Sequence, residues 1–390
     1  MALSNCNSGV QIKDYLDDAD RKPALSAIPE TLFVEVLVVV DDPLLQKIST
    51  YYKDGVWRTS RTGPKNRDPK AETILYVRKF MTALDIKFQD QFTNPKIKLH
   101  IAGVIVGEHM PFIRRQYGFD TFKTLKEMEH FFGNQTLKIM YPFDIVLLLT
   151  GEELFRTIDG WDGKYGLSTI GRACDYVKGR GGRNKNNANI IVQDLGQFSG
   201  VKVAAHHIGH LLGSYEDGEI SSAKCCSDDG YVMSGSLYNE RNINGIFYGK
   251  RNAQIWSPCS IKAIKTFVAT APCLFNTPYT NAYPLLEWSE LAKGTSKGVP
   301  HLHEQCSIYM KDATPEVHKA YACETKDPCQ YLQCNIYQGK VFLLGSSKEH
   351  HTYRCLAQER QYAMEGSGCG RDKYCYQGNC ITGNHSNCVL

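Results

Sequence analysis

The feature that most constrains this chain is a pair of histidines within residues 201–218, which read VKVAAHHIGHLLGSYEDG. Apolar side chains recur there at steps of four, three and four residues, a spacing that places them on one face of an α-helix. They are Val201, Ala205, Ile208 and Leu212. His206 and His210 lie four residues apart on another face, so both imidazoles can reach one point in space. Because this spacing is typical of a zinc-binding helix, we predict a metal site on it.

The residues beyond the pair extend the pattern. The longer metalloprotease pattern is H-E-x-x-H-x-x-G-x-x-H, followed downstream by a methionine turn. The chain keeps both histidines, has Gly213 at the glycine position and reads YVMS at residues 231–234. By resemblance to proteins with this pattern, Gly213 would let the chain turn sharply after the helix, and Met233 would pack beneath the metal.

Two positions depart from this pattern. His207 stands where the general-base glutamate belongs, and Glu216 stands where the third histidine belongs, followed by Asp217. A His-His-Glu set can bind zinc, so we predict Glu216 as the third ligand, with Asp217 as its replacement. The alternative interpretation of Glu216–Gly218 is an exposed acidic turn. An imidazole at position 207 can act as a base in principle, but its cationic form is disfavoured beside Zn²⁺.

Three short strings accompany the histidine helix, VVVD at 38–41, TGE at 150–152 and VQD at 192–194. With them the chain resembles the reprolysin (adamalysin-like) branch of the metzincin zinc endopeptidases, and in particular secreted arthropod forms such as tick salivary or scorpion venom metalloproteases. The resemblance implies one zinc ion, bound through His206, His210 and a third ligand. It also implies an active-site helix at the bottom of a cleft, with substrate extended along an edge strand.

Hydrophobic periodicity predicts alternating strands and helices. Buried strands are expected at 32–40, 97–106, 144–150 and 189–193, and helices after Asp68-Pro69 and at 122–132. Such alternation places helices on the faces of a sheet. The expected fold class is α/β, and by resemblance a metzincin-type catalytic domain with a mixed sheet at 31–278. Residues 1–30 are interpreted as a leader or propeptide remnant.

The cysteines predict a second, disulfide-rich region. There are 15, and nine lie between Cys306 and Cys388. This density is typical of secreted proteins with a disulfide framework. We expect a connector at 279–302 and a small cysteine-rich module at 303–390, similar to the modules that follow reprolysin domains. Zinc binding by these cysteines is disfavoured because their spacing is not that of a zinc knuckle. Residues 1–21 are polar, so export would need a signal peptide outside this chain.

The same resemblance implies two disulfides in the first domain. Cys174 would pair with Cys273, and Cys225 or Cys226 with Cys259; of the doublet we assign Cys226. The total number of cysteines is odd, so at least one thiol is free or intermolecular.

Charge and hydropathy limit the partners. The formal net charge of +4 favours neither nucleic acid nor a membrane surface. No apolar run approaches the ~18 residues of a membrane span. Basic residues gather at 178–185 and 58–70, which we interpret as solvated loops, with a polyanion site as the alternative. The expected partner is an extracellular protein, either a substrate or a binding partner, and the oligomeric state stays open.

Two functional hypotheses are carried forward. The first is a secreted zinc metalloendopeptidase whose activity is much reduced or absent, because a lost general base costs roughly 10²–10⁴ in rate. The second is a catalytically dead pseudoprotease that binds a protein partner.

Overall fold

The structure is a computed structural model, and the parts of the chain that it describes are the following. They are residues 28–53, 68–107, 110–114, 119–155, 165–235, 252–278, 282–286, 301–313, 321–323, 328–330, 332–342, 349–357 and 362–382. The predicted segment 1–30 lies almost entirely outside them. Among the described residues, no helix combines the length and the apolar character needed to cross a membrane.

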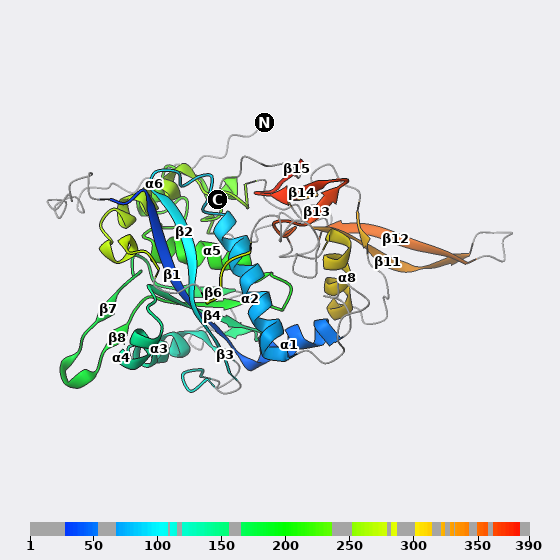
Figure 1. Cartoon of the computed structure of the whole chain (residues 1–390). Helices are drawn as coiled ribbons and strands as arrows, with labels where there is room; N and C mark the ends of the chain where they lie inside the picture. The colour runs from blue at the N-terminus through cyan, green and yellow to red at the C-terminus, as the bar shows by residue number, and fades with distance from the viewer. Residues whose placement is uncertain are drawn as a thin grey trace.

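A five-stranded mixed sheet forms the centre of the fold (Figure 1). Its strand order is β2 (Lys96–Val106), β1 (Thr31–Val40), β4 (Ile145–Thr150), β9 (Asn189–Gln193) and β6 (Gly166–Ser168). The first four strands are parallel, and β6 runs antiparallel to β9 at the edge. Strands β4 and β9 are buried throughout, as expected of parallel strands covered on both faces. The four predicted strands are therefore confirmed.

Helices cover both faces of this sheet. Side chains alternate along β1, so Val36 and Val38 face one core while Leu37 and Val39 face the other. The first core also contains residues of α1 (Asp42–Lys53), α2 (Pro69–Ile86) and α5 (Gly200–Leu211). The second contains residues of α3 (Thr121–Phe131), which precedes the short α4 (Gln135–Met140). The α/β fold class is confirmed.

Shorter elements complete this region. Strand β3 (Phe119–Asp120) pairs with β5 (Leu154–Phe155), and β7 (Tyr176–Val177) pairs with β8 (Lys185–Asn186). Five short helices follow in the order η2 (Arg180–Gly182), η3 (Ile220–Ser222), η4 (Ser227–Asp229), α6 (Pro258–Val268) and η5 (Pro272–Phe275). Helix α6 begins with Pro258 in its first turn, and Ser257 Oγ accepts a hydrogen bond from Ser260 N, a typical N-cap.

The C-terminal region is rich in disulfides, as predicted. It contains α8 (Leu302–Ala313) and two three-stranded antiparallel sheets. The first sheet has β10 (Tyr321–Ala322), β11 (Gln333–Phe342) and β12 (Glu349–Ala357); the second has β13 (Gly368–Gly370), β14 (Lys373–Tyr376) and β15 (Asn379–Thr382). Four disulfides cross-link them: Cys306–Cys334, Cys323–Cys355, Cys329–Cys375 and Cys369–Cys380. Their apolar cluster is small, so the cross-links stabilise what burial alone does not.

The C-terminal region also packs against the end of α2. Lys87 Nζ lies 3.3 Å from Glu365 Oε1, and both side chains are 3% exposed. Tyr376 donates a hydrogen bond to Asp90 at 2.9 Å, and its ring belongs to the same core as α5. The sequence-based boundaries at 278 and 303 remain predictions, but the regions on either side of them share packing.

Candidate metal centre

Helix α5 carries the histidine pair into the interior. Its first backbone N–H, that of Gly200, donates to Asp194 Oδ2 at 3.0 Å. Asp194 Oδ1 in turn accepts from Tyr76 on α2, so the start of the helix is fixed to the core. His206 and His210 are 2% and 7% exposed, and their ring centroids lie 4.5 Å apart. The predicted helix therefore brings the two imidazoles together.

Backbone carbonyls determine which nitrogen of each ring carries the proton. Val232 O lies 2.9 Å from His206 Nδ1, and Ser214 O lies 2.9 Å from His210 Nδ1. A carbonyl only accepts, so both Nδ1 atoms must donate. In the neutral rings the Nε2 atoms are then unprotonated. This is the arrangement of metal-binding histidines, whose second nitrogen donates to a carbonyl or carboxylate.

A sharp turn after α5 brings Glu216 back to the histidines. Gly213 has φ +88°, a conformation that favours glycine, and a Cβ there would approach Phe267 Cβ to 2.9 Å. The turn places Glu216 Oε1 3.8 Å from His206 Nε2. One ligand atom each from His206, His210 and Glu216 lies within 4.8 Å of the others. The three predicted ligands are thus brought to one point.

His206 Nε2 and Glu216 Oε1 face each other, and both are hydrogen-bond acceptors. Burial, followed by the neighbouring His210, lowers the pKa of His206 to about 3, so the ring is neutral at neutral pH. Burial also lowers the pKa of His210. An unprotonated nitrogen opposite a carboxylate oxygen does not form an ion pair, and two sets of lone pairs repel. A cation between them would remove that repulsion, which makes the pair a metal-ligand geometry.

Because Gly235 has no side chain, the Glu216 carboxylate has room to lie against it. A Cβ on Gly235 would overlap Glu216 Oε2 and lie 3.2 Å from Glu216 Cδ. The backbone there cannot easily move away, because Gly235 N donates to Ser227 Oγ at 3.1 Å. Ser234 Oγ donates to Ser227 O at 2.8 Å on the same turn. The carboxylate therefore occupies space that a side chain would otherwise fill.

These residues fit a zinc ion. Zinc bonds to nitrogen and oxygen measure about 2.0–2.2 Å, so tetrahedral ligand atoms lie about 3.4 Å apart. Here His206 Nε2 and Glu216 Oε1 are 3.8 Å apart and all three ligand atoms lie within 4.8 Å of one another, so the side chains would move closer together on binding. Met233 is fully buried, and a Cβ on Gly209 of α5 would lie 2.6 Å from its sulfur. The methionine turn thus packs directly against the histidine helix.

The alternative ligand, Asp217, is directed elsewhere. Its Oδ1 accepts hydrogen bonds from Ser257 Oγ at 2.5 Å and Ser260 Oγ at 3.1 Å. Its Oδ2 is buried and has no hydrogen-bond partner among the described residues. Burial raises the pKa of Asp217 despite these contacts. Asp217 therefore anchors the methionine turn to the start of α6, and it is not in the group of ligand atoms around His206.

His207 is fixed against the edge strand β6. Its Nδ1 lies 2.9 Å from Ser168 Oγ. A Cβ on Gly166 would lie 2.5 Å from both Cδ2 and Nε2 of the ring, so Gly166 leaves room for the imidazole. His207 is not among the ligand atoms that meet within 4.8 Å. The residue at the general-base position is therefore held by the strand.

The two disulfides of this region can be compared with the expected pairs. Cys174 is joined to Cys273, and Cys225 is joined to Cys259. Our choice of Cys226 as the partner of Cys259 was wrong. Cys226 precedes η4 with extended backbone angles. Cys226 is itself disulfide-bonded.

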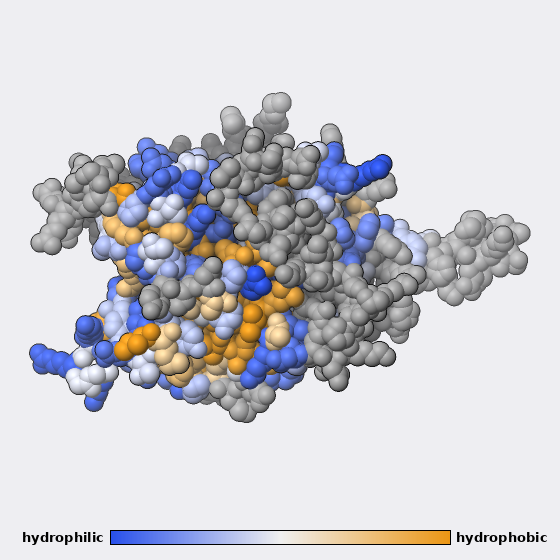
Figure 2. Space-filling view, viewed as in Figure 1, coloured by the Kyte–Doolittle hydropathy of each residue, from blue (hydrophilic) through white to orange (hydrophobic). Residues whose placement is uncertain are grey.

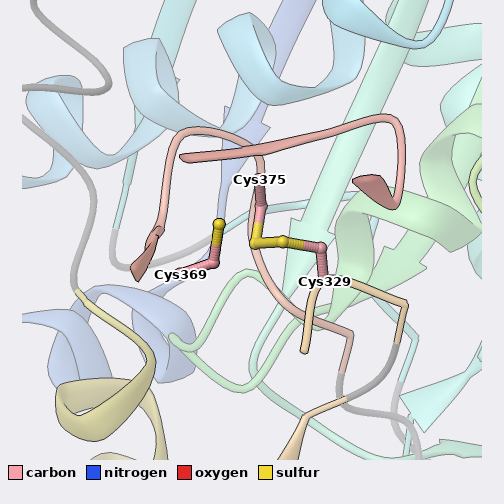
Figure 3. A group of neighbouring side chains, drawn as sticks. All are labelled: Cys329, Cys369 and Cys375. Carbon is pink, nitrogen blue, oxygen red and sulfur yellow. A yellow bond between two sulfur atoms is a disulfide. The ribbon is translucent and has the colours of Figure 1, made fainter. Parts of the chain in front are cut away.

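Two other groups of potential ligands are not metal sites. Cys329, Cys369 and Cys375 lie close together, but Figure 3 shows a bond between the sulfurs of Cys329 and Cys375. Cys369 pairs with Cys380. Asp144 lies beside the Cys174–Cys273 disulfide, whose sulfurs are likewise oxidised. Disulfide sulfurs are not thiolates, the form in which cysteine binds metals.

Sequence reasoning did not find Gly166, Ser168 or Gly235. Each lies against a residue of the motif in the folded chain. None stands at a position in the sequence that the motif defines. Gly235 follows the YVMS string directly, but nothing in the sequence indicates that it faces Glu216.

Comparison with known proteins finds that the chain is similar to metalloproteinases. No protein-family model matches it. A protein of Bombyx mori described as "A disintegrin and metalloproteinase with thrombospondin motifs like" is 28% identical over 337 residues, covering 80% of this chain and 42% of its own. Venom metalloproteinase 2 of Eulophus pennicornis is 31% identical over 186 residues, covering 45% and 41% respectively. Venom metalloproteinase BumaMPs1 of Olivierus martensii is 27% identical, covering 50% and 46%.

The chain thus spans less than half the length of these relatives. Among solved structures, an archaemetzincin from Methanopyrus kandleri aligns with a TM-score of 0.32 and 13% identity, over 60% of this chain and 96% of its own. These last values are too low to support an inference about function. The sequence matches themselves confirm the predicted resemblance to venom and ADAMTS-like metalloproteinases.

Proposed function

We propose that this chain, a homologue of the reprolysin-type metalloproteinases, is a secreted protein that binds one zinc ion but hydrolyses peptide bonds weakly or not at all. The observation that carries the proposal is the asymmetry of the site. The groups that would hold the metal face one another, whereas the residue at the general-base position is fixed to β6.

His206, His210 and Glu216 would hold the zinc, the histidines through Nε2. Val232 O and Ser214 O keep the protons on Nδ1 and so fix both rings in the metal-binding tautomer. Bound zinc would supply a Lewis acid and lower the pKa of a coordinated water to about 7. Proton transfer from water to the leaving amine would still require a base. His207 offers Nδ1 to Ser168, and the other edge of its ring lies over Gly166.

Two features support a binding role for the region around the candidate metal centre. Strand β6 is at the edge of the described sheet, where an extended peptide can add as a further strand. The relatives include venom metalloproteinases, and the chain is rich in disulfides, as expected of an extracellular protein. A secreted pseudoprotease that captures a protein segment without cleaving it combines these features.

The test measures metal content and hydrolysis on the same preparations. Elemental analysis of wild-type protein, purified without chelator and dialysed, should give about one zinc per chain. Hydrolysis of an unfolded protein substrate should be at least roughly 10² slower than for the variant His207→Glu/Glu216→His, which restores the family pattern. A chain without zinc after incubation with zinc salt contradicts the metal assignment. A double variant no faster than wild type contradicts the explanation for weak activity.

A further inference from the structure

The hairpin of β7 and β8 carries a cluster of positive charges. We call residues 176–186 the basic finger. It contains Lys178, Arg180, Arg183 and Lys185, and no acidic residue occurs from Tyr176 to Gln193. The chain has 45 Lys and Arg against 41 Asp and Glu, and 45 less these four is 41. The net charge of the finger thus equals that of the whole chain, and residues 58–70 form a second basic segment.

The basic finger is held in one conformation by its own contacts. The strands pair Tyr176 with Asn186, and Asn184 Nδ2 donates to the Tyr176 hydroxyl at 2.9 Å. Tyr176 donates in turn to Gly133 O, which ties the base of the finger to the turn after α3. Gly179 N donates to Asn184 Oδ1 at 3.1 Å across the hairpin. A ligand would therefore meet cations whose backbone is already ordered, which lowers the entropic cost of binding.

The tip projects away from the body of the molecule. Figure 1 shows β7 and β8 extending from the lower left, and Figure 2 shows a hydrophilic projection there. Gly181 and Gly182 have φ +67° and +76°, and a Cβ on either would meet nothing within 4 Å. Lys178, Arg180 and Arg183 are exposed and form no ion pair within the part of the chain that the structure describes. Lys185, at the base, has an acidic neighbour, Glu129, at 3.8 Å.

We propose that the basic finger binds a sulfated polysaccharide. Guanidinium groups bind tetrahedral oxyanions through paired N–H donors, and a narrow projecting hairpin can lie along a linear anionic chain. A membrane surface is disfavoured because the tip reads Arg-Gly-Gly-Arg and offers no large apolar side chain for insertion. Single-stranded nucleic acid is disfavoured because stacking needs exposed aromatic rings, and Tyr176 is half-buried at the base. The site is separate from the metal centre and does not depend on its activity.

Binding is tested with the full chain and heparin as the probe. Wild-type protein should be retained on immobilised heparin at about 0.15 M salt and eluted by added salt, because screening weakens exposed charge contacts. The variant Arg180→Gln/Arg183→Gln should raise the dissociation constant for heparin in solution by about tenfold or more. Its zinc content and circular dichroism should match those of wild type, which shows that it is folded.

A second exposed hairpin provides the matched control. The variant Arg371→Gln/Lys373→Gln removes two positive charges, one from the turn between β13 and β14 and one from the first residue of β14, and it should bind heparin as wild type does. Chemically desulfated heparin should not compete. Equal loss in both variants would indicate a general charge effect and overturn the assignment to the basic finger. Preferential binding to vesicles containing phosphatidylserine, or to oligonucleotides, would overturn the choice of a sulfated polysaccharide.

Discussion

Ser168 Oγ lies 2.9 Å from His207 Nδ1, so a strand at the edge of the described sheet holds the histidine that follows the first candidate ligand. Ser168 also contacts the backbone carbonyl of His207 at 3.3 Å. The imidazole is thus part of the packing between α5 and β6, where Gly166 leaves space for it. The strand contact fixes the orientation of the imidazole, whose ring centroid lies 5.2 Å from that of His206.

If His207 serves only in packing, its removal should not change hydrolysis. We expect His207→Ala to hydrolyse an unfolded protein substrate at the wild-type rate within about twofold, and His207→Glu to be faster by roughly 10². Both rates are measured with zinc content matched. A drop of an order of magnitude in His207→Ala would show that the imidazole does act as a base.

Zinc affinity should depend on the absence of a side chain at Gly235, next to the Glu216 carboxylate. We expect Gly235→Ala to weaken zinc binding by about tenfold, because the added methyl group displaces the Glu216 carboxylate, a ligand whose loss costs on the order of 1–2 kcal/mol. Gly235 has an ordinary φ, so alanine introduces no backbone strain of its own.

Zinc affinity is measured by competition with a chromophoric chelator, and the thermal stability of the zinc-free protein serves as a check on folding. Gly370→Ala is the control, since a Cβ there makes only ordinary contacts of 3.5 Å or more with Lys373. Equal affinities in Gly235→Ala and wild type would remove Glu216 from the ligand set.

Stability should depend on pH through Asp85 on α2. Burial raises the pKa of Asp85 from 3.8 to about 6, although Leu99 N and Gln89 Nε2 donate to the carboxylate and Lys98 lies nearby. Between these values the folded state keeps a proton that the unfolded chain has lost. The free energy of unfolding therefore falls as pH rises from 3.8 to about 6, by up to about 3 kcal/mol.

Asp85→Asn should remove this part of the pH dependence, because an amide does not titrate and its oxygen can still accept from Leu99 N. Urea unfolding of both proteins at several pH values gives the difference directly, since other buried acids such as Asp144 contribute equally to both. If the free energies of unfolding of the two proteins changed with pH in parallel, Asp85 would have the same pKa in the folded state as in water.

The Lys87–Glu365 pair joins α2 to the C-terminal region through two buried charges. Lys87→Met should lower the free energy of unfolding by about 3–5 kcal/mol, because it leaves Glu365 charged or forces it to take up a proton. The double variant Lys87→Met/Glu365→Met should recover most of that loss. Urea unfolding of the single and double variants completes a double-mutant cycle. Additive effects would mean that the two charges do not interact.

Regular periodicity made much of this fold predictable. Residues 32–40 were expected to form a strand and are β1 with one residue more, and Asp68-Pro69 begins α2 as its capping chemistry indicates. The ligands came from a motif on a single helix and its following turn, where local geometry fixes the spacing. Gly166, Ser168 and Gly235 could not be found in this way, because they reach His207 and Glu216 only after the chain has folded. The sequence does not distinguish Cys225 from Cys226 as the partner of Cys259, because the two are identical and adjacent.

The packing of the C-terminal region has a consequence for a cleaved chain. Met364 and Tyr376 belong to the core that contains α5, and Gln377 Nε2 donates to Ile86 O at the end of α2. A single proteolytic cut between residues 286 and 302 would therefore leave two fragments that remain bound to each other. Gel filtration would report one particle of unchanged size, and the histidine helix would keep its packing until both fragments unfold together.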